Sequence, residues 1–430
     1  MLCTLYILQS ISIARLELQK LSNSPLLDVL ILSRFRTIWY FGIITEIGRR
    51  MELFVLIWIL LEITNNSPYH LGIFLLINNV PRPMFSIFTG LLADRYNRNT
   101  LLILGAILNV ITAIVLFSLI SVDILVVWHI LVASWLNGFS RALEDPARRT
   151  GILDIVGERR IVNAVSVDSF SNMCGKIIGP ILGASLFTFK GYPGAYLTIV
   201  FINILTVVIA TRIRIPKKTI TSDPEPVLRS LKNGMIYVKN SKMILGMFYI
   251  TILMNGLAFE AFNFIPDIGK NYLLVSPILV GVLVASEGIG QGIGAFMLSL
   301  TRNINRYGLW FVIGSSIILV VIILFSWSNI YILSIFLLLV SGMALSVFAT
   351  MQSTIAMLYT PSDMRGRVMG LLSICIGTGH LLAFEIGLLA SKVGTPWALS
   401  LNAAIGLILI IPSLTLTPII KSRYTQTLDK

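Results

Sequence analysis

Ionisable side chains occur inside long apolar runs of this chain, where each must face a cavity or a partner. The first such run carries Glu46, Arg49, Arg50 and Glu52. At about 100° per residue these side chains fall within one arc of about 160° on a helix, and Glu46 has the spacing to pair with Arg49 or Arg50. A charge facing lipid at the bilayer centre costs about 2.5 to 3.5 kcal/mol on insertion scales. The pattern therefore predicts a charged binding or ion pathway at membrane depth.

Charges at membrane depth are distributed unevenly between the two halves of the chain. The first half has five bases against three acids, namely Arg49, Arg50, Arg82, Arg141 and Lys176 against Glu46, Glu52 and Asp168. The second half has no Lys or Arg at this depth, and its set is Glu260, Glu287, His380 and Glu385. A cavity between the halves would have one positive and one negative wall, which suits an anionic or zwitterionic ligand. A second interpretation stays open, in which the three acids form salt bridges across the halves and bind nothing.

Twelve apolar segments must position these side chains. A bilayer span takes about 20 mostly apolar residues, and stretches of that length lie at 38–63, 69–93, 99–121, 124–145, 162–189, 194–213, 243–265, 277–300, 308–327, 330–352, 368–390 and 396–417. The 430-residue chain is 56% hydrophobic and 12% charged, whereas a soluble domain carries about 25% charged residues. The composition therefore excludes a soluble protein and predicts an all-α integral membrane protein.

Basic residues indicate on which side of the membrane the connecting loops lie. With a cytoplasmic N-terminus, the cytoplasmic segments hold 25 of the 33 Lys and Arg residues, and the outer loops hold only Lys190, Lys270 and Lys392. Such an excess of basic residues is typical of cytoplasmic loops. We therefore expect a multi-pass protein of the plasma (inner) membrane with both termini in the cytoplasm. The net charge of +13 follows this membrane pattern and does not predict nucleic-acid binding.

The longest polar stretch, residues 214–242, divides the chain into two sets of six segments. Its Pro-rich part predicts a linker, and the rest predicts a basic amphipathic helix on the membrane surface. A weak repeat relates the stretch that begins at Pro146 to the one that begins at Thr350, and parallel repeats of this kind build two-half membrane folds. The expected parts are an N-terminal segment 1–33, a six-helix half 34–213, the linker 214–242, a six-helix half 243–417 and a tail 418–430.

A short charged turn lies between the second and third apolar segments. Residues 90–98 read Gly-Leu-Leu-Ala-Asp-Arg-Tyr-Asn-Arg and place Asp94, Arg95 and Arg98 between two spans. Gly90 allows close approach of helices, and the Asp94 carboxylate can face the positive N-terminus of a neighbouring helix. The turn thus has the residues of a polar contact between helices at the membrane surface.

Two further motifs lie in or beside the spans. Gly175, Gly179, Pro180 and Gly183 give the fifth span the small-xxx-small spacing of a close, kinked helix crossing. The fourth span is followed by Asp145-Pro146-Ala147-Arg148, and the eleventh is preceded by Arg365-Gly366-Arg367.

These motifs resemble those of transporters of the major facilitator superfamily. The family's loop between helices 2 and 3 reads Gly-x-Leu-Ala-Asp-Arg-x-Gly-Arg-Arg. Here Asn97 replaces its glycine, although Asn also tolerates left-handed backbone, and Asn99 replaces a basic residue. The fifth-span motif is similar to the exporters' Gly-x-x-x-Gly-Pro-x-x-Gly-Gly, with Ala184 for the last glycine. The Pro-Ala-Arg and Arg-Gly-Arg elements resemble the enterobactin-exporter and macrolide-efflux-like branch, and the resemblance covers residues 34–417.

The resemblance implies twelve transmembrane helices in two six-helix pseudo-repeat halves of the major facilitator fold. Asp94 would lock the halves together on the cytoplasmic side with Arg148 as its partner, and the rest of this gate would be Gly90, Arg95, Arg98, Arg365 and Arg367. The branch implies secondary active export of a siderophore-, macrolide- or drug-like molecule by alternating access, in exchange for protons. The alternatives are an importer of the same fold and a transporter-like receptor that no longer transports.

Proton exchange needs a carboxyl group that takes up a proton near neutral pH in a dry setting. Glu287, Glu260 and Glu385 are favoured because no basic residue is near them in sequence, whereas the adjacent arginines would hold Glu46 ionised. Structural acids in a wet vestibule are the alternative. The scattered Cys and His residues predict no metal site, and the chain shows no catalytic motif of an enzyme. We therefore expect a monomer without cofactors, with a small-molecule substrate, protons and the lipid bilayer as its partners.

Overall fold

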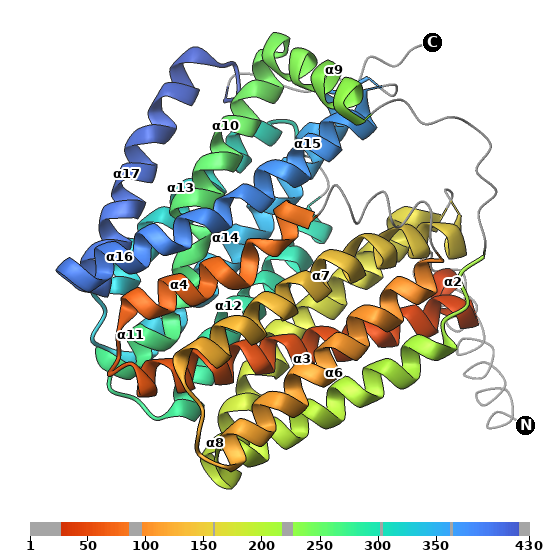
Figure 1. The fold of residues 1–430 in the computed structure, drawn as a ribbon. Coiled ribbons are helices and arrows are strands. Elements are labelled where there is room, and N and C mark those ends of the chain that lie inside the picture. The colour runs from red at the N-terminus through yellow and green to blue at the C-terminus, as the bar shows by residue number, and fades with distance from the viewer. Residues whose placement is uncertain are drawn as a thin grey trace, which may run out of the picture.

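The computed structural model describes residues 27–85, 97–157, 160–216, 227–301, 304–361 and 364–420. Within these ranges the chain forms helices joined by short connections, and it forms no strand. Figure 1 shows the helices packed side by side, with most of the red-to-yellow-green elements in one bundle, the green-to-blue elements in the other, and the orange α4 alongside the blue α16. This arrangement confirms the predicted all-α fold.

The first half is built from α2 (Leu27–Leu30), α3 (Ser33–Ile63), α4 (Pro68–Asn79), α6 (Arg98–Ser121), α7 (Val127–Val156) and α8 (Ile161–Arg212). The second half follows α9 (Val227–Asn240) and is built from α10 (Lys242–Leu257), η2 (Phe259–Phe264), α11 (Ile265–Asn271), α12 (Pro277–Leu300), α13 (Tyr307–Ser326), α14 (Tyr331–Leu358), α15 (Arg365–Thr378), η3 (Gly379–Leu382), α16 (Ala383–Val393) and α17 (Thr395–Leu416). Each of the twelve predicted spans coincides with helical residues in the described part of the chain.

Seven described stretches have the length and apolar composition to cross a membrane. The long helix α8, which covers two of the predicted spans, counts as one of the seven. A 50-residue stretch of α8, Asn163–Arg212, would measure about 75 Å at the α-helical rise, more than twice the thickness of a bilayer core. The helix breaks at Gly191, whose φ of 69° lies in the region that favours glycine. The helix α8 therefore makes two spans that run in opposite directions, as the sequence predicted.

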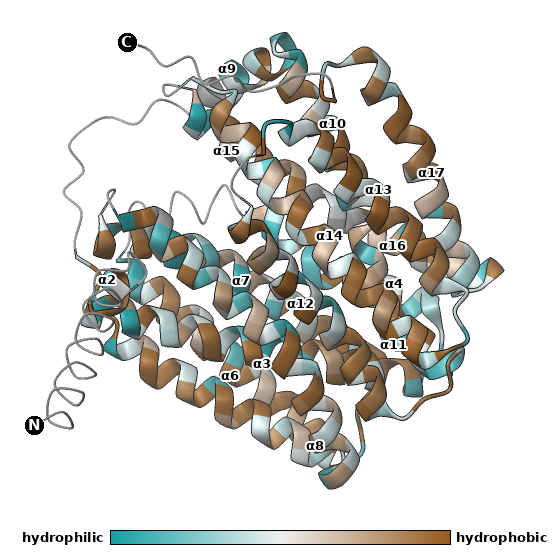
Figure 2. Cartoon of the chain, turned by 180° about the vertical axis from the view of Figure 1, so that it is seen from behind, coloured by the Kyte–Doolittle hydropathy of each residue, from teal (hydrophilic) through white to brown (hydrophobic). Residues whose placement is uncertain are grey.

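Large apolar side chains point outward along the membrane-spanning helices. On α6, Leu104, Ile107, Ile111 and Ile114 are all exposed and follow helical spacing, and Ile289, Ile293 and Phe296 do the same on α12. Figure 2 shows such hydrophobic residues over most of the bundle's length. Soluble proteins rarely expose apolar patches of this extent, so these stripes are the lipid-facing surface.

Small residues bring the two halves into contact. A Cβ atom at Gly281 of α12 would lie 3.0 Å from the Ala184 Cβ and from the Pro180 carbonyl oxygen of α8. A Cβ atom at Gly72 of α4 would lie 2.8 Å from the Cα of Gly387 in α16. Membrane helices approach this closely where glycine and alanine remove side-chain bulk. The pairs α8–α12 and α4–α16 thus form the seams between the halves.

The bundle has two chemically different ends. We call the end at which α7 ends and α15 begins the basic end, and the end at which α3 ends and α4 begins the opposite end. At the opposite end Glu62 accepts hydrogen bonds from Trp58 Nε1 (2.9 Å) and from the Tyr192 hydroxyl group. The Nζ of Lys270, from α11 of the other half, lies 3.9 Å from Glu62 Oε1 and 5.1 Å from the centre of the Trp58 ring. These four residues, the Glu62 cluster, join the halves at the opposite end.

The described helices of the two halves separate toward the basic end. In Figure 1, α7 and the start of α15 diverge at that end, and α15 packs against α9, α10 and α14. No described atom lies within 4 Å of a Cβ atom built at Gly366 or Gly370 of α15. The halves are therefore in contact at the opposite end, and Gly366 and Gly370 of α15 face open space within the described structure at the basic end.

The predicted amphipathic segment of the linker forms α9, which packs against α15 and α10 at the basic end. A Cβ atom at Gly234 would lie 2.9 Å from Leu371 of α15, and the Tyr237 hydroxyl group donates to the Tyr359 carbonyl oxygen at 2.9 Å. Met235 and Ile236 are exposed on its other side. The helix therefore attaches the linker to the second half in addition to any contact with the membrane surface.

Candidate functional site

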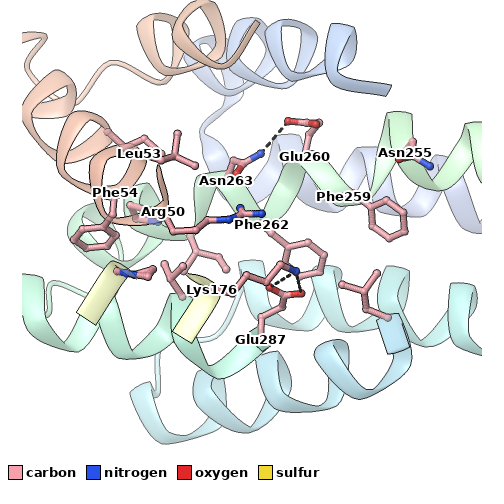
Figure 3. Close-up of a pocket in the computed structure, with 16 residues that line it drawn as sticks. Arg50, Leu53, Phe54, Lys176, Asn255, Phe259, Glu260, Phe262, Asn263 and Glu287 are labelled. Carbon is pink, nitrogen blue, oxygen red and sulfur yellow. Dashed lines mark hydrogen bonds and ion pairs between the residues drawn. The ribbon is translucent and has the colours of Figure 1, made fainter. Parts of the chain in front are cut away.

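A cavity of about 300 Å³ lies between the two halves. We call it the central cavity. Most of its lining is apolar and includes Leu53 and Phe54 of α3 and Phe259 and Phe262 of η2, and Figure 3 shows these side chains around the open space. Its polar groups are Arg50, Lys176, Asn255, Glu260, Asn263 and Glu287. A mostly apolar pocket with a few convergent polar groups is typical of a small-molecule site.

One ion pair crosses the central cavity from half to half. Lys176 Nζ of α8 donates to the two carboxylate oxygens of Glu287 of α12 at 2.9 and 3.2 Å, and to Gln291 Oε1 at 3.2 Å. The Glu287 side chain is only 8% exposed. The interpretation that acids form salt bridges across the halves is therefore correct for Glu287. Glu287 was favoured as a proton site because no basic residue is near it in the sequence. That reason is wrong for the folded chain, because Lys176, 111 positions away, contacts Glu287 in space.

The opposite wall of the central cavity carries a second carboxylate. Glu260 of η2 is buried, and its Oε2 accepts a hydrogen bond from Asn263 Nδ2 at 3.0 Å. Arg50 of α3 reaches into the space between this pair and the Lys176–Glu287 pair (Figure 3). Among the described residues the Arg50 guanidinium makes no ion pair. Arg50 is thus a partly buried cation whose donors are available to a ligand.

A second cavity, of about 140 Å³, lies within the first half, and we call it the arginine cavity. Its lining is almost wholly charged and consists of Glu46, Arg49, Arg50, Arg82, Arg141, Asp145, Arg148, Arg149 and Asn172. Arg49 is the centre of its ion pairs, since it contacts Glu46 (3.2 Å), Asp145 (3.2 Å) and Glu144. The predicted helical pair of Glu46 with Arg49 is confirmed. Arg50 lines both cavities and therefore connects them.

Two more ion pairs border the arginine cavity. Arg82 of the residues after α4 lies 3.4 Å from Asp145 Oδ2. Arg148 of α7 donates to Asp168 Oδ1 of α8 at 2.8 Å, and its guanidinium occupies the space that a Cβ atom at Gly42 of α3 would need. Arg148 therefore has a carboxylate partner in its own half, while the predicted partner Asp94 lies outside the described residues.

Two acids of this network were missing from the charge count made on the sequence. The predicted fourth span, 124–145, contains both acids, but Asp145 was assigned to the motif after the span, whereas α7 continues through Pro146 to Val156. Membrane helices tolerate an internal proline when neighbouring groups satisfy the freed backbone. Glu144 is 1% exposed and Asp145 is partly buried. The same extension of α7 also adds Arg148 and Arg149, so the formal excess of two positive charges in the first half is unchanged, and the central cavity is lined by Arg50 and Lys176 of the first half and by Glu260 and Glu287 of the second.

Glu52 belongs to a separate buried network in the first half. Its Oε1 accepts a hydrogen bond from Asn137 Nδ2 at 3.1 Å, and Asn137 Oδ1 accepts one from the Thr112 hydroxyl group at 3.0 Å. Among the described residues Glu52 makes no ion pair, although it is only 6% exposed. Asn137 and Thr112 could not be recognised from the sequence, because uncharged polar residues are common in membrane helices and their spacing gives no signal.

The glycines of the fifth span face α3. Cβ atoms at Gly175 and Gly179 would lie 2.8 Å from the Glu46 carbonyl oxygen and 2.6 Å from the Arg50 Cβ, and one at Gly183 would lie 3.2 Å from the Met51 carbonyl oxygen. The motif, which includes Pro180, thus lets α8 pack directly on the α3 turns that carry Glu46 and Arg50. The other side of α8 carries Lys176 to the central cavity.

The residues predicted for the gate are described only in part. Gly90, Asp94 and Arg95 lie outside the described residues, while Arg98 begins α6, pairs with Asp154 and donates to the Thr150 carbonyl oxygen at 3.2 Å. Asn97 caps α6 with a φ of −64°, so the left-handed backbone that its position allows is not used. At the start of α15, Arg365 Nε donates to the Thr360 carbonyl oxygen at 3.1 Å, and Arg367 contacts Met364 Sδ at 3.1 Å.

Glu52 and Glu385, two residues of the predicted pathway, do not line either cavity. Glu385 lies on α16, partly buried, and one of its carboxylate oxygens is fully buried without a hydrogen-bond partner among the described residues. His380 lies in η3, and its side chain is outside the described part of the structure. The structure therefore brings Arg50, Lys176, Glu260 and Glu287 together and leaves Glu385 apart from them.

An all-helical membrane bundle with two halves around a polar-edged cavity defines a transporter of the major facilitator type. A sequence profile described as transmembrane secretion effector matches residues 25–426, and the chain belongs to this family. The chain is thus a multi-pass membrane transporter and not an enzyme.

Individual relatives and solved structures are similar over almost the whole chain. The chain is 24% identical over 426 residues to the enterobactin exporter EntS of Escherichia coli O127:H6 and to that of Shigella flexneri, and the match covers 96% of each chain. A bacterial homolog of the human lysosomal transporter Spinster has a TM-score of 0.66 at 14% identity, over 91% of this chain and 98% of that one. The nucleoside transporter NupG has a TM-score of 0.69 at 12% identity, over 89% and 99%. These structural likenesses show the shared fold.

Proposed function

We propose that this protein exports a small anionic or zwitterionic molecule across the inner membrane in exchange for protons. The observation that carries the proposal is the central cavity, which lies between the halves and whose charged lining is Arg50 and Lys176 of the first half and Glu260 and Glu287 of the second. Because Lys176 is paired with Glu287, Arg50 is the cation available to an anionic group, and a positive group of a zwitterion could lie near Glu260. The enterobactin exporters among the relatives support the outward direction and a siderophore-like or drug-like substrate.

The proposed orientation places the basic end and both termini in the cytoplasm, because basic residues are in excess on that side. The described structure is then closed to the outside by the Glu62 cluster and by the contact of α4 with α16. A substrate would enter from the cytoplasm. Rocking of the halves about the central cavity would open the other side, as alternating access requires.

The Lys176–Glu287 pair is a proposed contact for the substrate, and the exchanged proton needs a separate site. An anionic substrate competes with Glu287 for the Lys176 ammonium group, which now contacts both carboxylate oxygens. A buried carboxylate that loses its cation is costly and is neutralised by a proton. Substrate at Lys176 and a proton on Glu287 would therefore favour each other, whereas exchange needs a proton site that is filled when the substrate has left. We propose Glu52 for that role, because it makes no ion pair in the described structure.

The gate at the basic end and the monomeric state are also proposals. Arg148, Arg98 and the arginines that begin α15 lie at this end, where Asp94 would join them. Attraction between the Asp94 carboxylate and the arginines that begin α15 would hold the halves together once α7 and α15 approach each other. Both cavities are formed within one chain, which supports a monomer as the working unit.

Uptake into inside-out membrane vesicles tests the proposal. Enterobactin serves as the anionic probe and a cationic dye as the comparison, in vesicles with an acidic or a pH-matched lumen. We expect enterobactin uptake that needs the acidic lumen and is abolished by a protonophore, and the Lys392→Ala variant should match the native protein because Lys392 lies outside both cavities. Uptake that does not depend on the proton gradient would exclude proton exchange. Uptake only in right-side-out vesicles would show that the protein is an importer.

A further inference from the structure

Two chemically different cavities adjoin each other at Arg50. The central cavity, about 300 Å³, is lined mainly by apolar and aromatic side chains, whereas the arginine cavity, about 140 Å³, is lined by charged residues and one Asn. Arg50 belongs to both linings. A single ligand that passes Arg50 can therefore place one part in each environment.

The arginine cavity has more positive than negative charge. Six arginines line it, and Arg49, Arg82 and Arg148 are paired with the carboxylates Glu46, Glu144, Asp145 and Asp168. Six cations against four anions leave an excess of two positive charges. Arg50, Arg141 and Arg149 make no ion pair within the described ranges.

Hydrogen-bond donors are also left over in this cavity. Arg141 Nε and Arg49 Nε are buried without an acceptor among the described residues. An unsatisfied buried donor is costly, and its presence beside an empty space indicates a missing acceptor. Guanidinium groups bind oxyanions such as phosphate or carboxylate through paired hydrogen bonds. The volume of about 140 Å³ is roughly that of four to five waters, which admits a compact oxyanion.

We infer that the substrate is an amphiphilic anion, with an apolar body in the central cavity and a compact group of about two negative charges in the arginine cavity. This inference rests on the proposed function, since it assumes that the central cavity holds the transported molecule. The two excess positive charges match a dianionic group, and Arg50 marks the junction between its charged and apolar parts. A neutral molecule with the same body, or the oxyanion alone, would use only one of the two cavities.

Binding to the purified full-length protein in nanodiscs tests the inference by isothermal titration calorimetry. The soluble probes are 4-phenylbutyl phosphate, 4-phenylbutanol and inorganic phosphate, and dodecyl phosphate represents a lipid-derived source of the same chemistry. We expect 4-phenylbutyl phosphate to bind at least about tenfold more tightly than either of its parts. Tighter binding of dodecyl phosphate would indicate a lipid-derived substrate, and tighter binding of the phenyl compound a soluble aromatic one; both outcomes support an amphiphilic anion.

Two variants separate the cavities. Arg141→Gln should weaken 4-phenylbutyl phosphate about tenfold and leave 4-phenylbutanol unchanged, because Arg141 lines only the arginine cavity. Phe259→Leu should weaken both ligands, because Phe259 lines only the central cavity. Arg149→Gln, an exposed position, repeats the test if the first variant fails to fold, and Arg212→Gln, an exposed arginine outside both cavities, is the control.

Equal affinity for 4-phenylbutyl phosphate and 4-phenylbutanol would overturn the inference. Unchanged affinity for 4-phenylbutyl phosphate in both Arg141→Gln and Arg149→Gln would overturn it as well. Proton-driven uptake of another molecule alongside either result would leave the proposed function intact. Binding as expected without any transport would instead contradict the proposed function and leave the two-part site standing.

Discussion

The Lys176→Met variant should turn the ion pair across the central cavity into a buried carboxyl group without a cation. In the native protein Lys176 Nζ lies 2.9 and 3.2 Å from the oxygens of Glu287, whose side chain is 8% exposed. Removing one partner of such a buried pair costs about 3 to 5 kcal/mol, because the remaining charge keeps its desolvation cost. Met has nearly the length of Lys, so the variant changes the charge far more than the packing.

The free-energy cost of leaving the Glu287 carboxylate buried without a cation should depend on pH in a defined direction. The folded variant avoids it only by protonating Glu287, whereas a glutamate in the unfolded chain ionises above roughly pH 4.3. Because the unfolded state then binds fewer protons than the folded state, the free energy of unfolding of the variant falls as the pH rises, until Glu287 ionises in the folded state as well. The difference between native protein and variant should therefore be small near about pH 5 and largest near about pH 8.

Thermal unfolding in a neutral detergent, followed by circular dichroism at both pH values, measures this difference. Lys176→Met should melt clearly below the native protein at the higher pH and close to it at the lower pH. The second substitution Glu287→Gln should restore the melting temperature, and Lys392→Met, at an exposed position, should have no effect. An equal loss at both pH values, or no recovery in the double variant, would refute the reasoning.

Three further variants test other parts of the structure. Lys270→Ala removes the cation of the partly exposed Glu62 cluster and should loosen the closed end. The rate at which an impermeant reagent labels a cysteine introduced at Leu53 from outside should then rise about two- to fivefold. Lys392→Ala is the control, and an unchanged labelling rate in Lys270→Ala would contradict a closing role. Gly179→Val places side-chain atoms against Arg50 and Met51 and should lower the free energy of unfolding by about 1 to 3 kcal/mol or more. The loss should be seen as disappearance of the monodisperse peak in size-exclusion chromatography. Gly366→Ala, in open space, should leave the elution profile unchanged. Asp94→Asn should abolish transport while membrane insertion stays normal, and native transport rates in this variant would contradict a gate at Asp94.

The architecture could be predicted from the sequence because bilayer physics constrains it tightly. Runs of about 20 apolar residues predict spans, and each of the twelve predicted runs coincides with described helix. The break inside α8 also followed from sequence, since Gly191 and the polar residues around it interrupt two apolar runs. The glycines at 175, 179 and 183 predicted a close crossing, although their spacing could not say that α3 is the helix they contact.

The candidate site could be predicted only in part, because charge pairing depends on distance in space. Glu287 seemed isolated from bases in sequence, yet it meets Lys176 of the other half. Asp145 was assigned to a motif after the fourth span because Pro146 suggested the end of a helix that in fact continues to Val156. The arginine cavity could not be foreseen either, since α3, α7 and the residues after α4 contribute to it from distant parts of the chain.

The most direct test of the central claim, a cavity that opens to each side in turn, is a pair of spin-label distances measured by double electron–electron resonance. One pair of labels at Arg149 and Gly366 reports on the basic end, and another at Asp123 and Leu274 reports on the opposite end. Adding enterobactin with a proton gradient in reconstituted vesicles should shorten the first distance and lengthen the second in the same population. Two distances that stay constant while transport proceeds would contradict alternating access about this cavity.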